Sequence, residues 1–225
     1  YSNWVKNHEN QNRHDDLING EGLKYRPLIS IIMPVFNAPT KFLSEAIKSV
    51  LNQTYNNFEL CIADDNSDSK RVKETLKKLA KTDSRIKVIY RKETGNISKA
   101  TNSAISIATG EYIGFLDHDD ILNSSALMSV VAALNFNKNL KLIYSDEDKI
   151  NPNGIRVSPY FKPDWNFNLF LSQNYLCHFV VLEKQTFDAH GCFRSECDGA
   201  QDWDNLLHII SKIKDEQILH IPKVL

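Results

Sequence analysis

The chain has 225 residues, of which 42% are hydrophobic and 24% charged, and its formal net charge is -1. This length suits one large domain, and the near-zero charge excludes a globally basic surface for nucleic acid or anionic lipid. No apolar stretch reaches the roughly 18 to 20 residues that span a bilayer, and residues 1–16 lack the apolar core of a signal peptide. We therefore expect a cytoplasmic protein that holds any anionic ligand with local groups.

The cysteines show no metal or disulfide pattern. No CxxC pair occurs among the four, and two of them, Cys61 and Cys177, lie in apolar strand-like runs where a reduced, buried thiol is expected. The spacing therefore favours neither a structural zinc site nor a disulfide framework.

The first elements follow a strand-then-helix order. Residues 1–27 are polar and end at Pro27, which predicts an N-terminal arm or short helix before the core. The continuous apolar run at 28–34 predicts a strand covered on both faces. Apolar residues at helical spacing then predict a helix that carries Leu43, Ala46, Ile47, Val50 and Leu51.

The same strand-then-helix unit recurs three times. The predicted strands span 58–64, 86–90 and 112–116, and a further strand is predicted at 140–146. Three helices are predicted between these strands. The first spans about 69–81, the second carries Ala100, Ala104, Ile107 and Ala108, and the third carries Leu127, Val130, Val131 and Leu134. This alternation predicts an α/β fold with a mainly parallel, Rossmann-like sheet flanked by helices.

Beyond residue 146 the pattern is less regular. Residues 147–166 hold three prolines and a turn at Asn153-Gly154, and we expect a long ordered loop there. Predicted to follow are a strand at 176–182, a turn at 191–193, a helix opening within 198–204 and a strand at 218–222. We therefore divide the domain into a ligand-binding half, 28–146, and a less regular half, 147–225, which is the place for a second substrate.

Three strand ends carry unusual chemistry, namely 33–37 (MPVFN), 63–68 (ADDNSD) and 117–120 (DHDD). Parallel strands bring their carboxyl ends to one edge, where ligands bind in open α/β sheets. The aspartates of the strand end 63–68 could accept hydrogen bonds from a nucleotide. The closely spaced carboxylates of the strand end 117–120 suit Mg²⁺ or Mn²⁺ bound together with a diphosphate. Helix caps and Asx turns are the structural alternatives for both acidic segments.

Other nucleotide-binding classes lack their sequence patterns. Neither GxGxxG after the first strand nor GxxxxGK[ST] occurs, so a Rossmann dinucleotide site and a P-loop are not supported. A sugar nucleotidyltransferase needs a glycine-rich, basic loop after that strand, which MPVFNAPTK is not. A truncated, inactive nucleotide-binding or assembly domain is a further alternative.

Ordered motifs over 27–225 resemble family 2 glycosyltransferases with the GT-A fold, in particular the bacterial group that acts on polysaccharides, O-antigens and other surface glycans. The motifs are SIIMPVFN, SVLNQTYNNFELCIADDNSD, TGEYIGFLDHDD, IYSDEDKI, FKPDWNFNLFLSQNYL and GAQDWD. The resemblance implies a metal-dependent, inverting transferase with a nucleotide-diphosphate sugar, most simply a UDP-sugar, as donor. It implies a glycan, glycoprotein or lipid-linked acceptor. Peripheral contact with the inner face of the cell membrane, and further domains of a larger chain, are left open.

The resemblance also implies roles for the segment 117–120, which we call the acidic loop. Asp117-His118-Asp119 corresponds to the family's DXD motif, so Asp119 would ligate Mn²⁺ or Mg²⁺, and Asp117 the ribose or the metal. Many relatives carry an arginine where Thr101 stands, and Lys99 is the candidate to replace its phosphate contact.

Further roles follow from the same resemblance. Asp65 would contact the base, and Asp202 matches the general base, with a helix N-cap as its structural alternative. The residues expected beside the base are Pro34, Val35 and Asn37.

Four residues at or beyond position 146 are weaker candidates. Asp146 would touch the donor sugar or lie in a solvated turn, and Trp203 would stack on a sugar ring or pack. His178 and His220 lie in apolar runs, and we expect satisfied core histidines at both positions.

Overall fold

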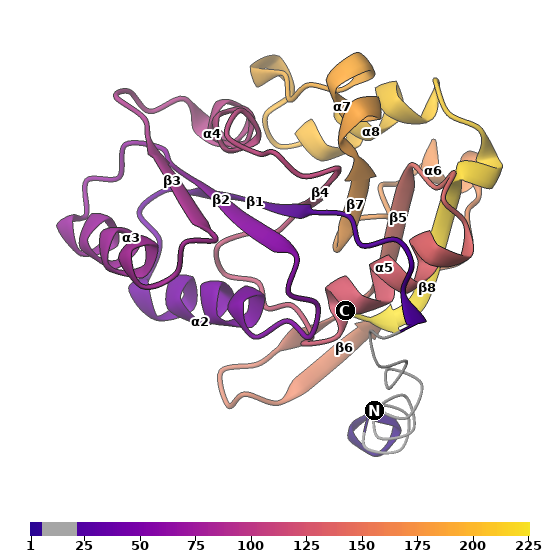
Figure 1. Cartoon of the computed structure of the whole chain (residues 1–225), viewed down its shortest axis with the longest axis horizontal. Helices are drawn as coiled ribbons and strands as arrows, with labels where there is room; N and C mark the ends of the chain where they lie inside the picture. Colours follow the sequence, from indigo (N-terminus) through magenta and orange to yellow (C-terminus); the bar gives the residue numbers. More distant parts are fainter. Residues whose placement is uncertain (6–21) are drawn as a thin grey trace.

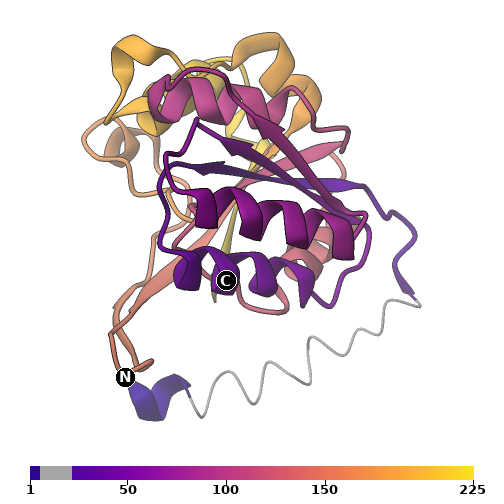
Figure 2. The ribbon, with the colours of Figure 1, turned by 90° about the vertical axis from the view of Figure 1, so that its left-hand side faces the viewer.

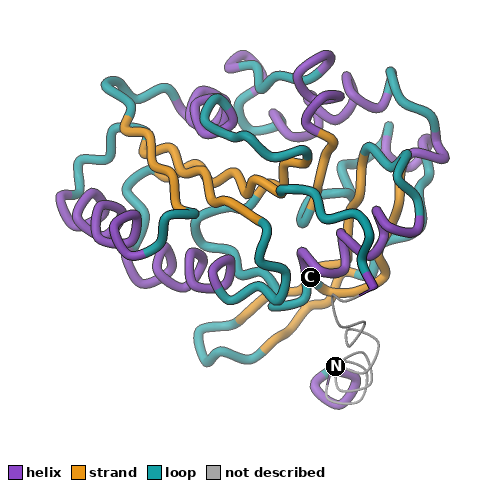
Figure 3. Tube along the Cα trace, viewed as in Figure 1, coloured by secondary structure: helices purple, strands orange, loops and turns teal. Residues whose placement is uncertain are grey.

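The computed structural model describes residues 1–5 and 22–225. Helices and strands alternate through the first half and are mixed with irregular segments in the second (Figure 1; Figure 3). The elements are β1 (Ile29–Val35), α2 (Thr40–Leu51), β2 (Phe58–Asp64), α3 (Lys70–Thr82), β3 (Ile86–Tyr90), α4 (Asn96–Ile105), β4 (Tyr112–Phe115), α5 (Ala126–Phe136), β5 (Leu142–Ile150), β6 (Arg156–Tyr160), α6 (Phe167–Phe170), β7 (Val180–Glu183), α7 (Lys184–His190), η2 (Ser195–Cys197), α8 (Gln201–Ile210), η3 (Asp215–Gln217) and β8 (Ile218–Val224).

The described residues form one mixed sheet in the order β3-β2-β1-β4-β7-β5-β6, with β8 paired to β5. Strands β3, β2, β1 and β4 are parallel, whereas β7 is antiparallel to both β4 and β5. The carboxyl ends of β1, β2 and β4 therefore meet at one edge. The expected α/β fold is confirmed.

Helices cover both faces of the sheet (Figure 2). On one face α2, α3 and α5 pack against buried residues such as Ile31 and Leu60. On the other face α4, α6, α7 and α8 pack against Ile32, Cys61 and Ile113. Because strand side chains alternate between faces, the unbroken apolar runs of β1 and β2 supply both layers.

The prediction of a loop at 147–166 is wrong for the first part of this range, because β5 continues to Ile150 and pairs with β6 in a hairpin. The turn at Asn153-Gly154 is confirmed: Gly154 has φ +75°, and Asn151 N–H donates to the Ile155 carbonyl at 2.9 Å. An Asn-Gly pair between two strands is a hairpin signal that outweighs the flanking prolines. Pro159 is tolerated because β6 is an edge strand.

The strand expected at 176–182 forms only from Val180 onward. The His178 N–H donates to the Glu147 carboxylate at 2.5 Å instead of to a neighbouring strand, so the ladder cannot extend toward Cys177. Helix α7 was not predicted. Helix α4 ends at Ile105, before the expected Ile107 and Ala108.

A buried carboxylate joins β1, β2 and the loop after α4. Glu59 accepts from Ser30 Oγ at 2.7 Å, from Thr109 N–H at 2.6 Å and from Thr109 Oγ1 at 3.0 Å, and its Oε2 lies 2.5 Å from Lys87 Nζ. These four donors more than offset the burial that by itself raises the pKa, and they lower the pKa of Glu59 to about 2. Glu59 thereby fixes the strands that position the pocket.

Most of the predicted arm, 6–21, lies outside the described residues. Residues 2–5 are helical, and Trp4 packs against Phe161 with ring centroids 4.9 Å apart.

All four cysteines are free thiols. Among the helices described, none has both the length and the apolar character needed to cross a bilayer.

Candidate active site

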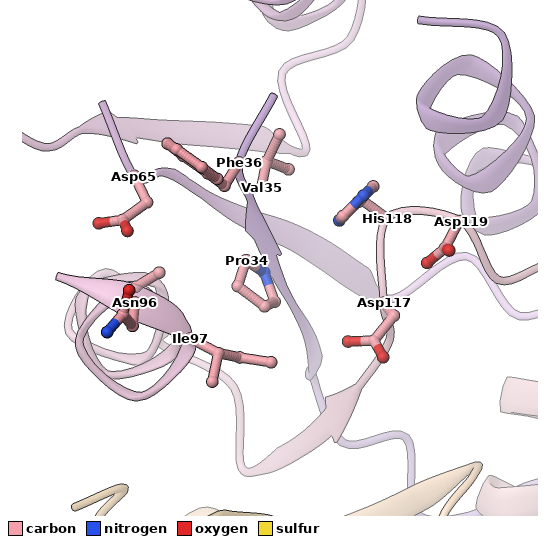
Figure 4. A pocket seen from close by; sticks show the side chains of 10 residues that line it. Pro34, Val35, Phe36, Asp65, Asn96, Ile97, Asp117, His118 and Asp119 are labelled. Atoms are coloured by element: carbon pink, nitrogen blue, oxygen red, sulfur yellow. The ribbon is translucent and has the colours of Figure 1, made fainter. Parts of the chain in front are cut away.

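A pocket of about 350 Å³ opens at the carboxyl ends of β1, β2 and β4 (Figure 4). This volume lies within the range of small-molecule sites. Six residues predicted for the site line it, namely Pro34, Val35, Asp65, Asp117, His118 and Asp119. Phe36, which belongs to the candidate strand end 33–37, lines it as well. Three residues of α4, which were not predicted for the site, complete the lining: Asn96, Ile97 and Ala100.

Asp65 forms one end of the pocket and is only 2% exposed. Arg91 Nε donates to its Oδ1 at 2.7 Å, and the Gly95 N–H donates to both oxygens at 3.0 Å. A glycine suits this position, because a Cβ there would lie 2.6 Å from Arg91 Nη2 and 2.9 Å from Lys99 Cβ, so that neighbouring side chains would have to shift. The cap of α3 is Ser69, whose Oγ accepts from the Val72 N–H, so Asp65 is not a helix cap.

Asn37 and Lys99 are not among the residues that line the pocket. Asn37 has φ 46°, and its Oδ1 accepts from the N–H groups of Asp68 and Ser69 at 2.9 and 3.3 Å. Asn37 thus ties the end of β1 to the loop before α3. The Lys99 side chain is exposed on α4, and its carbonyl accepts from Arg91 Nη1 at 3.0 Å.

The acidic loop lies at the other end of the pocket, after β4. Asp117 and Asp119 line the pocket, and Asp120 follows in a turn closed by its N–H to the Asp117 carbonyl at 3.2 Å. Desolvation raises the pKa of Asp120; His178 opposes this, and the charges of Asp117 and Asp119 raise it further. The loop therefore concentrates negative charge that a cation would offset.

Asp202 lies in the first turn of α8 and comes close enough to Asp117 for their charges to interact. Desolvation raises the pKa of Asp202, His178 lowers it, and Asp117 raises it further. Gln201 Nε2 donates to Asp202 Oδ2 at 2.8 Å, while Gln201 Oε1 accepts from the Gly199 N–H at 2.7 Å. The N-cap of α8 is Ala200, so Asp202 is not the cap.

Asp146 and Trp203 are engaged by protein groups away from the pocket lining. Asp146 Oδ1 accepts from the Lys162 N–H and lies 2.8 Å from His220 Nε2. Trp203 Nε1 donates to the Phe170 carbonyl at 3.0 Å. His220 is the satisfied core histidine that the sequence predicts, since it also stacks on Tyr144.

His178 differs from the prediction of a core position, because it is only half-buried and lines a small cavity together with Asp202. The apolar neighbours in LCHFVVL indicated a core position. Arg91 and Gly95 were also missed, although the composition RKETGN after a strand is a signal for a polar loop at the ligand edge.

Fold and site together define an α/β domain with its ligand pocket at the carboxyl edge of a parallel sheet. The profile of the family described as Glycosyl transferase family 2 matches residues 30–191. The chain belongs to family 2 of the glycosyltransferases.

Two relatives illustrate the sequence similarity. Uncharacterized protein y4gI of Sinorhizobium fredii is 45% identical over 203 residues, which are 90% of this chain and 22% of the relative. O-antigen biosynthesis protein RfbC of Myxococcus xanthus is 37% identical over 187 residues, which are 83% of this chain and 15% of the relative. This chain thus spans about a fifth of their length.

Solved structures share the GT-A fold at low sequence identity. TarS 1-349 of S. aureus superposes with a TM-score of 0.72 at 20% identity over 87% of this chain and 58% of that one, and its complex with UDP gives 0.70 at 21% identity with the same coverage. The mannosyltransferase PcManGT of Pyrobaculum calidifontis, in complex with GDP-Man and Mn²⁺, gives 0.63 at 16% identity over 88% of this chain and 58% of that one.

Proposed function

We propose that this chain is the catalytic domain of a metal-dependent, inverting glycosyltransferase. It transfers a sugar from a UDP-sugar to a hydroxyl of a glycan acceptor in bacterial surface glycan or glycoprotein synthesis. The observation that carries the proposal is the pocket itself, which runs from Asp65 to Asp117 and Asp119 of the acidic loop. The charge of Asp117 in turn raises the pKa of Asp202, which lines a small neighbouring cavity.

The donor nucleotide occupies the pocket in this proposal. Among the described residues, Asp65 Oδ2 accepts only from the Gly95 N–H, so it has lone pairs left for a base N–H. Pro34 and Ile97 supply apolar surface for the ring. The UDP complex of TarS, which shares the fold, supports this choice of nucleotide.

The acidic loop fits a divalent cation bound together with a diphosphate. The described residues hold no group of three or more His, Cys, Asp or Glu side chains arranged as a metal site. Mg²⁺ at nucleotide sites is commonly held by one or two carboxylates plus phosphate oxygens and waters, and Mn²⁺ also prefers oxygen ligands. Asp117 and Asp119 are the two carboxylates that would hold the cation, and the Mn²⁺ complex of PcManGT supports it.

The cation supplies positive charge to the departing diphosphate when it is bound. Asp202 accepts the proton of the acceptor hydroxyl, whose oxygen forms the new bond to the sugar C1. The bond from C1 to the phosphate oxygen breaks, and its electron pair leaves with the nucleoside diphosphate. A raised pKa makes Asp202 a stronger base, and a single base opposite the leaving group gives inversion.

The acceptor binds on the side of residues 147–225 in this proposal. The small cavity beside α8 is lined by His178 and Asp202. Helix α6 lies next to α8, because the Phe170 carbonyl of α6 accepts a hydrogen bond from Trp203 of α8. The proposal includes a cytoplasmic location for this domain, in reach of a lipid-linked or protein-bound acceptor.

The test compares Asp119→Asn and Asp202→Asn with the wild-type protein in a nucleotide-sugar screen with Mn²⁺. Both substitutions should abolish transfer, because one removes a metal ligand and the other the base. Asp119→Asn should also remove the thermal stabilisation by UDP and Mn²⁺, which Asp202→Asn should retain.

Asp188→Asn is the matched control, because Asp188 is exposed and, among the described residues, pairs only with Lys184, one turn earlier on α7. Transfer that persists in both site variants overturns the assignment of these residues. Pyrophosphate as the product would indicate a nucleotidyltransferase. Binding of UDP without transfer or donor hydrolysis by the wild-type protein would indicate a binding domain.

A further inference from the structure

Helix α4 contacts two parts of the site with different faces. Asn96, Ile97 and Ala100 line the nucleotide pocket, whereas Ser98 and Asn102, four residues apart, share another face. That second face meets the segment 193–198, which leads into α8 and lies on the same side of the sheet as α4 (Figure 1). Helix α4 is therefore a direct physical link between the pocket and the helix of Asp202.

Asn102 holds the backbone of Phe193 with both ends of its amide. Asn102 Nδ2 donates to the Phe193 carbonyl at 2.7 Å, and the Phe193 N–H donates to Asn102 Oδ1 at 3.2 Å. The Phe193 ring is 5% exposed, packs edge-on against Phe115 with centroids 5.3 Å apart, and lines a small cavity together with Asp202. Fixing Phe193 thus fixes one wall beside Asp202.

Ser98 makes the second connection, one turn earlier on α4. Its Oγ, which is buried, donates to Asp198 Oδ1 and also lies within hydrogen-bond distance of the Arg194 carbonyl, at 3.2 Å. The Ser98 N–H donates to the same Asp198 oxygen at 3.3 Å. Both ends of the segment 193–198 are therefore tied to α4.

The segment is in turn joined to the first turn of α8. Arg194 pairs with Asp204 through two hydrogen bonds, of which that from Nε is 2.9 Å long. Gly199, which directly follows the segment, donates its N–H to Gln201, and Gln201 donates to Asp202 Oδ2 at 2.8 Å. Hydrogen bonds from Ser98 to Asp198 and from Gly199 through Gln201 to Asp202, joined by the peptide bond between Asp198 and Gly199, thus connect α4 to the carboxylate of Asp202.

We propose that Asn102 and Ser98 are positioning residues that set the place of Asp202 relative to the nucleotide pocket. This inference rests on the proposed function, in which α4 contacts the donor and Asp202 is the base. A catalytic group displaced by about 1 Å lowers the rate by up to about 100-fold, so a small shift of the segment is enough to matter. Neither residue touches the reacting atoms.

The main experiment is Asn102→Ala, with Asn135→Ala as the matched control. Asn135 on α5 makes the same two-way contact with a backbone: the Tyr25 N–H donates to its Oδ1 at 2.9 Å, and its Nδ2 donates to the Tyr25 carbonyl at 2.8 Å. This contact lies on the opposite face of the sheet from α4. Both substitutions remove the two bonds to a backbone segment, and Asn135→Ala also removes a bond from Asn135 Nδ2 to the Val131 carbonyl at 2.9 Å. Only Asn102→Ala touches the segment before α8.

In Asn102→Ala we expect kcat to fall by about tenfold or more, while the donor KM and the UDP affinity change by less than about twofold. Ser98→Ala, which creates only a small cavity, should also lower kcat. In Asn135→Ala kcat should stay at the wild-type value although the melting temperature falls. Equal kcat losses in Asn102→Ala and Asn135→Ala would overturn the proposal, and so would an unchanged kcat in Asn102→Ala.

Amide hydrogen exchange tests the same inference without any activity. Exchange over 193–205 should be faster in Asn102→Ala and Ser98→Ala than in the wild-type protein and in Asn135→Ala. Unchanged exchange over this range overturns the positioning role. If the wild-type protein transfers no sugar, the proposed function fails, whereas the exchange result still decides whether α4 fixes the segment.

Discussion

Glu59 offers a sharp test of how the sheet is held together, through the substitution Glu59→Gln. The glutamine keeps the shape of the side chain but replaces one accepting oxygen by an NH₂ group that cannot accept from Thr109, Ser30 or Lys87. The carboxylate is 5% exposed, so water cannot replace the lost bonds. We expect a less stable protein with the same fold.

The magnitude follows from the pKa of Glu59, which falls from 4.5 to about 2 on folding. Since one pKa unit corresponds to 1.36 kcal/mol, ionised Glu59 stabilises the folded state by about 3 kcal/mol at pH 7. A group with a lowered pKa contributes fully above its unfolded pKa and loses its contribution as the pH falls through the folded pKa. The contribution should therefore shrink to about 1 kcal/mol at pH 3.

The assay is urea unfolding of the wild-type protein and Glu59→Gln at pH 7 and at lower pH. The difference in unfolding free energy should be about 3 kcal/mol at pH 7 and should narrow between pH 4.5 and 2. Glu216→Gln is the control, because that side chain is 73% exposed and its substitution should have almost no effect. A difference that is absent at pH 7, or that does not change with pH, would refute the reasoning.

Two more predictions concern the pocket and the sheet. Asp65→Asn should weaken UDP binding by about tenfold or more in calorimetry, because an NH₂ group in place of Oδ2 can accept neither from the Gly95 N–H nor from a base N–H; unchanged affinity would mean that the nucleotide binds elsewhere. Gly110→Ala should destabilise the protein by about 1 to 3 kcal/mol, since a Cβ would lie 2.6 Å from the Leu28 carbonyl oxygen. Gly22→Ala, with no atom within 4 Å of the added carbon, should not change the melting temperature measurably, and equal shifts in the two variants would contradict this account.

The first half of the fold is readable from the sequence because its signals are local. Apolar runs such as FELCIAD predict buried strands, and spacing at i, i+3 and i+4 predicts the helices between them. Parallel order then places Asp65, Asp117 and Asp119 at one edge, and all three line the pocket. Asp202 could be singled out only through the resemblance of GAQDWD to a family motif.

The second half is less readable because its structure depends on contacts between distant residues. The strand before Val180 is interrupted by the Glu147 carboxylate, which lies 31 residues away in the chain from His178. The hairpin of β5 and β6 was not predicted, because its prolines indicated a loop and are compatible with a strand only at the edge of a sheet.

By itself the sequence determined the alternation of strands and helices and the acidic strand ends, because periodicity and turn chemistry are properties of neighbouring residues. Only the tertiary structure decided that Arg91 and Gly95 hold Asp65, that His178 and Asp202 line one small cavity, and that Asn102 hydrogen-bonds to the backbone of Phe193. A buried polar group needs a partner with the right geometry, and which segment supplies that partner is settled only when the chain has packed.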